Sequence, residues 1–175
     1  NATAMTGNGS GNKLTVGETS PATPNTPAIN GDVVGGYSAA GAVTDNTVKI
    51  DSITLGLMNS VFGGQSTGTA AVTGNTVTVN GGDFTAGSNS IYGGQSTSGA
   101  ASNNTVTITG GTFATANVAG GAASTGTMSN GNKVVLGSDS GTYAANLSQA
   151  DVWGTRYAGD AVVASGNAAI TGNTL

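Results

Sequence analysis

A short pattern of asparagine, threonine and valine recurs along this chain at a nearly constant interval. Residues 75–84 read Asn-Thr-Val-Thr-Val-Asn-Gly-Gly-Asp-Phe, and residues 104–113 read Asn-Thr-Val-Thr-Ile-Thr-Gly-Gly-Thr-Phe, so the two copies begin 29 residues apart (104 − 75 = 29). A second motif, Phe-Gly-Gly-Gln-Ser at 62–66, returns as Tyr-Gly-Gly-Gln-Ser at 92–96. Self-similarity at this period predicts a stacked repeat architecture, in which one repeat cannot bury its apolar face without its neighbours.

An asparagine marks the start of the first strand in each repeat. The predicted strands begin at Asn12, Asn46, Asn75, Asn104 and Asn132. After Asn132 the next start is either Asn167 or Asn173. Residues 169–175 resemble residues 71–77, which favours Asn173 and makes the last repeat an expanded one of 41 residues (173 − 132 = 41).

Aliphatic and polar residues alternate with a period of two inside these strands, as expected for strands with one buried face. The predicted inward residues are Leu14/Val16, Val48/Ile50, Val77/Val79, Val106/Ile108 and Val134/Leu136. A slip of one residue would expose all of these aliphatic side chains, so the register is strongly specified. Two further rows are predicted to fill a second and a third side of the core: Phe84, Phe113 and Tyr143, and then Val34, Phe62, Tyr92, Ala119 and Trp153.

Three short strands per repeat, stacked like on like, predict an all-β fold: a parallel β-helix of five to six coils with roughly 28–41 residues each. The column Asn46, Asn75, Asn104 and Asn132 is interpreted as a structural ladder, because asparagine tolerates the left-handed conformation and stacked amides bond to one another. The Gly-Gly pairs are interpreted as coil corners that need a positive φ.

The composition argues against several classes of function. The chain has 175 residues, of which 7% are charged, and a net charge of −4. Its four basic residues form no cluster of the kind that binds nucleic acid or an anionic membrane surface. The chain has no Cys and no His, and no apolar run approaches the roughly 20 residues of a spanning helix. We therefore expect no cofactor, no metal centre, no catalytic residues and no membrane insertion by this segment.

The whole chain, residues 1–175, is expected to be one β-helical unit and a fragment of a longer repeat array. Within it we expect an N-terminal edge at 1–11, a proline-rich excursion at 17–28 and an expanded loop region at 144–168. If the protein binds a partner, these excursions are the expected place, because loops on a rigid scaffold vary without disturbing the stack.

Two functions of other classes remain open. A β-helical carbohydrate-active enzyme needs paired carboxylates or a carboxylate with a basic residue. The candidates for that chemistry are Lys49 with Asp51, and the group Asp151, Arg156 and Asp160. An ice-binding protein needs a long flat threonine array, and Thr76/Thr78 and Thr105/Thr107 form two adjacent rows, interrupted by Lys49 and Lys133 on either side.

The motifs Asn-Thr-Val-Thr-Val/Ile-x-Gly-Gly-x-Phe and Ile-Tyr-Gly-Gly-Gln-Ser resemble the passenger repeats of large bacterial autotransporter adhesins of type V secretion. The resemblance covers residues 12–175 and is strongest over 46–121. It implies a right-handed β-helix, export to the extracellular side of a bacterial cell surface, and a non-enzymatic stalk or scaffold for adhesion. Implied partners are a host or bacterial surface protein, a glycan, or a further copy joined end to end.

The expanded region contains the residue types that are most common at binding hot spots, namely Trp153, Arg156 and Tyr157. Because Trp153 continues the aromatic column of Phe62 and Tyr92, a core position is favoured for it. The tentative binding residues are therefore Arg156 and Tyr157.

Overall fold

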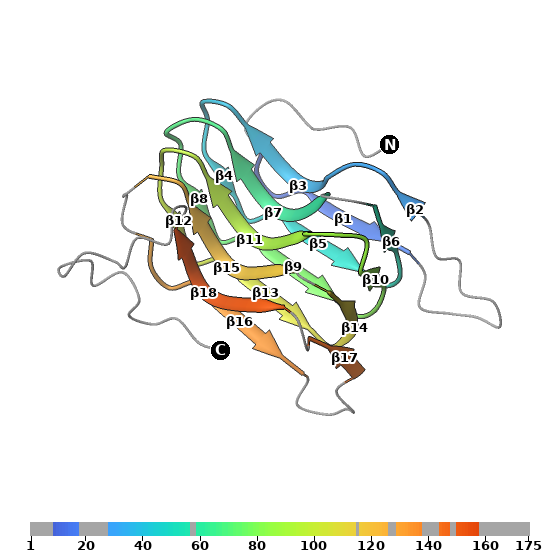
Figure 1. Cartoon of the computed structure of the whole chain (residues 1–175). Helices are drawn as coiled ribbons and strands as arrows, with labels where there is room; N and C mark the ends of the chain where they lie inside the picture. The colour runs from blue at the N-terminus through green and yellow to red at the C-terminus, as the bar shows by residue number, and fades with distance from the viewer. Residues whose placement is uncertain are drawn as a thin grey trace.

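The structure, a computed structural model, describes residues 9–17, 28–56, 59–114, 116–125, 129–137, 144–147 and 150–157. All regular structure in these ranges is β-strand, and every strand pair is parallel. The predicted parallel β-helix is therefore confirmed, and its strands follow one another along the axis of the stack (Figure 1). No helix within the described ranges is long and apolar enough to cross a bilayer.

Four parallel sheets run along this axis, and we number them in the order in which the chain enters them. Sheet 1 contains β1 (Lys13–Val16), β5 (Thr47–Ile50), β9 (Thr76–Val79), β13 (Thr105–Ile108) and β16 (Lys133–Leu136). Sheet 2 contains β2 (Ala28–Ile29), β6 (Thr54–Leu55), β10 (Asp83–Phe84), β14 (Gly110–Phe113) and β17 (Ala144–Asn146). Sheet 3 contains β3 (Val33–Ser38), β7 (Ser60–Ser66), β11 (Ser90–Ser96), β15 (Asn117–Ala123) and β18 (Asp151–Tyr157). Sheet 4 contains β4 (Val43–Thr44), β8 (Val72–Thr73) and β12 (Ala101–Ser102).

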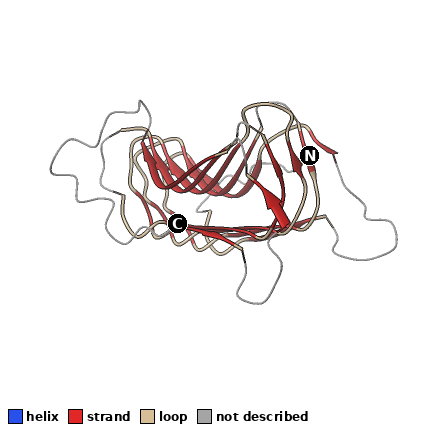
Figure 2. Ribbon diagram, turned by 60° about the horizontal axis from the view of Figure 1, so that its bottom comes forward, coloured by secondary structure: helices blue, strands red, loops and turns tan. Residues whose placement is uncertain are grey.

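The coils differ from the prediction in strand number and in count. Each complete coil has four strands, because a two-residue strand of sheet 4 precedes the asparagine corner (Figure 2). Three coils have strands in all four sheets, and the following two contribute described strands to sheets 1–3 only. The structure thus has about three complete coils, which is fewer than the five to six predicted.

Sheet 1 has the predicted register, and its predicted inward residues are buried or partly buried, with the exception of Leu136 at the end of β16, which is exposed. Val48, Val77 and Val106 are paired directly across three neighbouring strands. These valines are fully buried in the main core, together with Phe84 and Phe113, whose rings stack at a centroid distance of 4.7 Å. The burial of large apolar side chains between the sheets is the main stabilising contribution to this stack. Tyr143, predicted to continue the phenylalanine row, lies outside the described residues.

Sheet 3 buries apolar side chains on both of its faces, which differs from the expectation for its aromatic column. Val61 and Ile91 belong to the main core, whereas the next residues, Phe62 and Tyr92, belong to a separate cluster with Ala119. Successive side chains of a strand point to opposite faces, so this second cluster lies on the outer face of sheet 3. Phe62, Tyr92 and Ala119 are buried, as predicted, whereas Val34 and Trp153 of the same predicted row are only partly buried. The row lies outside the main core rather than on a third side of it.

The asparagine column forms a hydrogen-bonded ladder in the buried interior. Asn46 Nδ2 donates to Asn75 Oδ1 (2.8 Å), Asn75 Nδ2 donates to Asn104 Oδ1 (2.9 Å), and Asn104 Nδ2 donates to Asn132 Oδ1 (3.2 Å). The same oxygens accept backbone N–H groups of the preceding asparagines. At the last described step, Asn132 Nδ2 donates to Thr155 Oγ1 (3.0 Å).

The left-handed residues are not the asparagines of the ladder but the residues immediately before them. The positive-φ residues at this corner are Gly11, Asp45, Gly74, Asn103 and Gly131. A left-handed residue reverses the chain between sheet 4 and sheet 1, and glycine, asparagine and aspartate tolerate that conformation best.

The Gly-Gly pairs of sheet 3 lie inside strands, which corrects their interpretation as corners. A Cβ added at Gly94 would lie 2.6 Å from the side-chain amide of Asn104, and one added at Gly64 would lie 2.7 Å from that of Asn75. These glycines are required because the amide ladder fills the space that a side chain would need. In β18 the corresponding position is Thr155, which pairs with Gly121 in the register of sheet 3.

Three predicted boundary features change. Residues 144–146 and 151–157 form β17 and β18, so this part of the predicted expanded loop region belongs to the stack. Residues 28 and 29 form β2, while 18–27 of the proline-rich excursion lie outside the described residues, as do Asn167 and Asn173. In the predicted N-terminal edge, Gly9 packs against the stack and its carbonyl accepts a hydrogen bond from Asn46 Nδ2.

Candidate functional site

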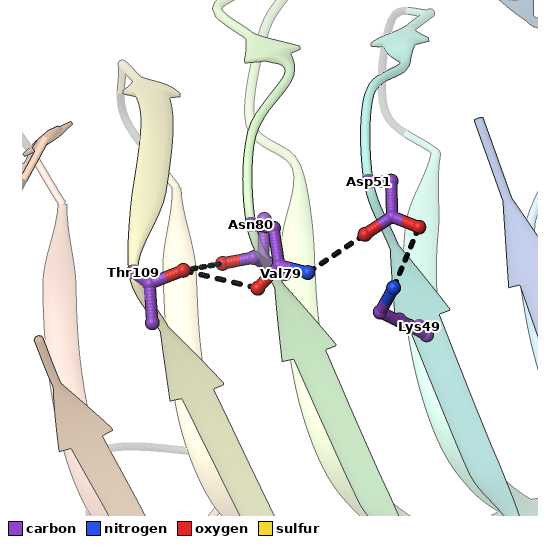
Figure 3. A network of polar contacts seen from close by, with 5 residues as sticks. All are labelled: Lys49, Asp51, Val79, Asn80 and Thr109. Carbon is purple, nitrogen blue, oxygen red and sulfur yellow. Dashed lines mark hydrogen bonds and ion pairs between the residues drawn. The ribbon is translucent and has the colours of Figure 1, made fainter. Parts of the chain in front are cut away.

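A polar network crosses three coils at the end of sheet 1 (Figure 3). Lys49 Nζ forms an ion pair with Asp51 Oδ2 (2.8 Å), and Asn80 Nδ2 donates to Asp51 Oδ1 (2.7 Å). Thr109 Oγ1 in turn donates to Asn80 Oδ1 (3.0 Å). Asp51, Asn80 and Thr109 thus connect equivalent positions of successive coils, and the Asp51 side chain is only 5% exposed.

The pKa of Asp51 reflects opposing effects. Desolvation raises this pKa, but the hydrogen bonds from Lys49 and Asn80 and the charge of Lys49 outweigh it, and the pKa lies below its usual value. Both carboxylate oxygens of Asp51 are engaged, and the next two residues of the column are the amide of Asn80 and the hydroxyl of Thr109. The candidate acid–base pair Lys49 and Asp51 is an ion pair within one coil, and its carboxylate also accepts the hydrogen bond from Asn80 of the next coil.

The outer face of sheet 1 carries the threonine columns considered for ice binding. Thr47, Thr76 and Thr105 are in register on three neighbouring strands, and Thr78 and Thr107 are in register beside them. The first column is bounded by Lys13 and Lys133, and the second meets Lys49. One threonine column therefore extends over three neighbouring strands and the other over two.

Both tentative binding residues lie in β18, at the last described position of sheet 3. Arg156 pairs in register with Ala122, and Tyr157 pairs with Ala123. The description of Tyr157 is limited to its backbone. These residues do not form an excursion from the stack, because the strand that carries them continues sheet 3.

Arg156 lies in a cluster with Trp153 and Tyr92 on the outer face of sheet 3. Its Nη1 donates to the Tyr92 hydroxyl (2.6 Å), and its guanidinium carbon lies 5.1 Å from the centroid of the Trp153 ring, in cation–π geometry. Tyr92 belongs to β11 and Arg156 to β18, so the side chain reaches across the intervening strand β15. That strand carries Ala119 and Ala122 at these positions, and both alanines are buried.

Tyr92 was predicted as a core residue and not as part of a site. The signal was present in the sequence of sheet 3, because each of its strands has two consecutive apolar residues before its glycine: Val33-Val34, Val61-Phe62, Ile91-Tyr92, Val118-Ala119 and Val152-Trp153. A pair of adjacent apolar residues requires an apolar environment on both faces of a strand. Ala119 and Ala122 are small, so a long side chain from a neighbouring strand, such as that of Arg156, can extend across β15.

Among the described residues, no group of three or more His, Cys, Asp or Glu side chains is close enough to hold a metal ion. Searches with protein-family models, among curated protein sequences and among solved structures found no significant match to this chain.

Proposed function

We propose that this chain is a segment of a non-enzymatic, surface-exposed β-helical scaffold that acts as a stalk or adhesin. The observation that supports this proposal is the continuous stack: parallel sheets, the buried valine columns and the asparagine ladder link each described coil to the next. Such a stack gains about 4.8 Å of length per coil and holds its outer side chains at fixed spacing. That geometry suits a spacer which presents binding residues away from a cell.

The resemblance of the repeat motifs to autotransporter passenger repeats supports a location on the bacterial cell surface. The outer face of sheet 1 carries threonine columns, and only 7% of the residues of the chain are charged, which is compatible with such a location. A further support is that one of the two candidate catalytic groups, Lys49 with Asp51, belongs to the network through which Asn80 contacts the neighbouring coil.

The proposal is tested by displaying the chain on a non-adherent bacterium through a heterologous membrane anchor. We expect attachment of these cells to epithelial cells or to one another above the level of the anchor alone. A matched control carries Val77→Asp, which places a carboxylate in the fully buried core and is expected to unfold the scaffold. Equal attachment by both display strains, or none by either, would refute an adhesive function of the folded stack.

Two assays separate the alternatives. Release of reducing ends from a panel of polysaccharides by the purified chain would favour the carbohydrate-active enzyme instead. Thermal hysteresis that is abolished by Thr78→Asp would favour ice binding at the threonine columns, since this residue lies at the centre of that face.

A further inference from the structure

The outer face of sheet 3 has two side-chain rows that are in register along the stack. One row contains Tyr92, Ala119 and Trp153 in three successive strands. The other contains Gln95, Ala122 and Arg156 in the same strands. The Tyr92–Trp153–Arg156 cluster therefore surrounds a coil whose two outward positions are both alanine.

The charge of Arg156 is not neutralised within the described part of the chain. Its Nη1 is bonded to a neutral phenol, its Nε is buried without a hydrogen-bond partner, and the ion pair found in the described ranges is between Lys49 and Asp51. Burying part of a cation without an anion costs desolvation free energy, and an anionic ligand would offset part of that cost. The guanidinium is also held in a fixed orientation, between Trp153 and Tyr92, which reduces the entropy lost on binding.

An amide donor lies in the same row. Gln65 Nε2 donates to Gln95 Oε1 (3.0 Å), which directs the amide nitrogen of Gln95 toward the next coil. The residue in register there is Ala122, which offers no acceptor. An indole ring, an amide and a guanidinium without an ion-pair partner in the described ranges thus lie on one face, beside the buried phenol of Tyr92. This combination suits a ligand with an apolar ring face, hydroxyls and an anionic group.

We propose that the Tyr92–Trp153–Arg156 cluster binds an anionic glycan. The anionic group of one sugar pairs with the Arg156 guanidinium, a neighbouring ring packs beside Trp153, and a hydroxyl accepts from Gln95. This inference rests on the proposed adhesive function and specifies the ligand class for it. Carboxylate and sulfate groups share the required chemistry, and separate probes distinguish them.

The experiment is a calorimetric titration of the 175-residue chain with an oligogalacturonate, a heparin oligosaccharide and neutral maltohexaose. We expect binding of one or both anionic probes and none of the neutral one. Arg156→Gln should weaken binding by about tenfold or more, as expected for the loss of a charge-assisted hydrogen-bond pair. Tyr92→Phe, which keeps the ring and loses the hydroxyl, should weaken it by less than Arg156→Gln does.

Lys133→Gln is the matched control, because it removes the same charge from an exposed position on sheet 1 in the same region of the stack. It should leave the affinity within about twofold of the unmodified chain, since exposed charges far from a site are screened by salt. Equal weakening by Lys133→Gln and Arg156→Gln would show non-specific attraction and overturn the proposal. Absence of binding by the unmodified chain at millimolar glycan would overturn it as well.

Two further outcomes separate this site from the function on which it rests. If Arg156→Gln does not fold by circular dichroism, Tyr92→Phe decides, and unchanged affinity in that variant refutes the site. If displayed cells attach and the Arg156→Gln strain attaches equally well, adhesion stands and this site is wrong. If the purified chain binds the glycan but displayed cells do not attach, the site stands and the adhesive function is wrong.

Discussion

Substituting Gly94 and Asn104, singly and together, measures how strongly the glycine pairs and the asparagine ladder depend on one another. A Cβ added at Gly94 would lie 2.6 Å from Cγ, Nδ2 and Oδ1 of Asn104, so Gly94→Ala forces the amide aside. Overpacking of this kind costs about 1–3 kcal/mol of unfolding free energy. Asn104→Ala removes four hydrogen bonds, two to Asn75 and one each to Val72 and Asn132. At about 1 kcal/mol net for each bond, that variant loses about 4 kcal/mol.

The double variant should be less destabilised than the sum of the two single variants. Once Asn104→Ala has removed the amide, the methyl group introduced by Gly94→Ala occupies the vacated space and the overpacking disappears. We expect a coupling free energy of about 1–3 kcal/mol in favour of the double variant, the size typical of residues in direct contact.

Urea unfolding followed by circular dichroism measures all three variants against Gly31→Ala. Gly31 has no atom within 4 Å of an added Cβ and no positive φ, so this control should change the unfolding free energy by less than about 0.5 kcal/mol. Additivity of the two single variants within about 0.5 kcal/mol would refute the shared-space explanation. If Asn104→Ala does not fold, the test is the comparison of Gly94→Ala with Gly31→Ala. A loss of unfolding free energy in Gly94→Ala that is no larger than the loss in Gly31→Ala would then refute the shared-space explanation.

Three other perturbations follow from the same structure. Val77→Asp should lower the urea midpoint far more than Thr78→Asp, because Val77 is fully buried and Thr78 lies on the outer face of sheet 1; equal midpoints would disprove the register. Asp51 has a lowered pKa in the folded chain, so its contribution to stability is complete above the usual carboxyl pKa of about 3.9 and is lost as the pH falls through the lower folded value. Urea midpoints of Asp51→Asn should therefore fall less between pH 5 and pH 2 than those of the unmodified chain, by roughly the contribution of one carboxylate. Asn89 is fully buried, and neither polar atom of its side-chain amide has a hydrogen-bond partner in the described part of the chain. Asn89→Leu should therefore raise the urea midpoint or leave it unchanged, whereas Asn75→Leu, which breaks the ladder, should lower it. An equal decrease of the midpoint in both variants would contradict this difference.

The parts of the fold that were predictable are those in which one physical requirement produces one sequence pattern. Val77 and Val106 alternate with Thr78 and Thr107, and only a strand with one buried face requires that alternation. Phe84 and Phe113 recur at the same interval as these valines, so their common burial follows from the repeat.

The parts that were not predictable are those in which two requirements leave the same pattern. Glycine is required at Gly82 because the backbone has a positive φ, and at Gly94 because a side chain would collide with Asn104. The sequence does not distinguish these two roles. The two-residue strands of sheet 4 are too short to show a period. Phe62 and Tyr92 lie on β7 and β11, where two consecutive apolar residues are buried on opposite faces, so the period of two does not show which face is the core.

Of the candidate site, Arg156 could be predicted from the sequence, whereas its contact with Tyr92 could not. Arg156 stands out because it is the only arginine in a chain with few charges. Its contact with Tyr92 joins residues 64 positions apart, and it exists because the strand between them carries alanines. That arrangement depends on the register of three coils, which no local pattern in the sequence contains.

The direction of the amide ladder makes the two ends of the stack unlike. From Asn46 to Asn104, each Nδ2 points to the following coil and each Oδ1 to the preceding one, so the amide dipoles are aligned along the axis. A coil that continues the ladder must bring an acceptor; at Asn132 this place is taken by the hydroxyl of Thr155, in β18 of the same coil, instead of an asparagine carbonyl. A coil added before the first must bring a donor. Two such stacks can therefore continue one ladder only head to tail, an arrangement that builds filaments rather than closed pairs.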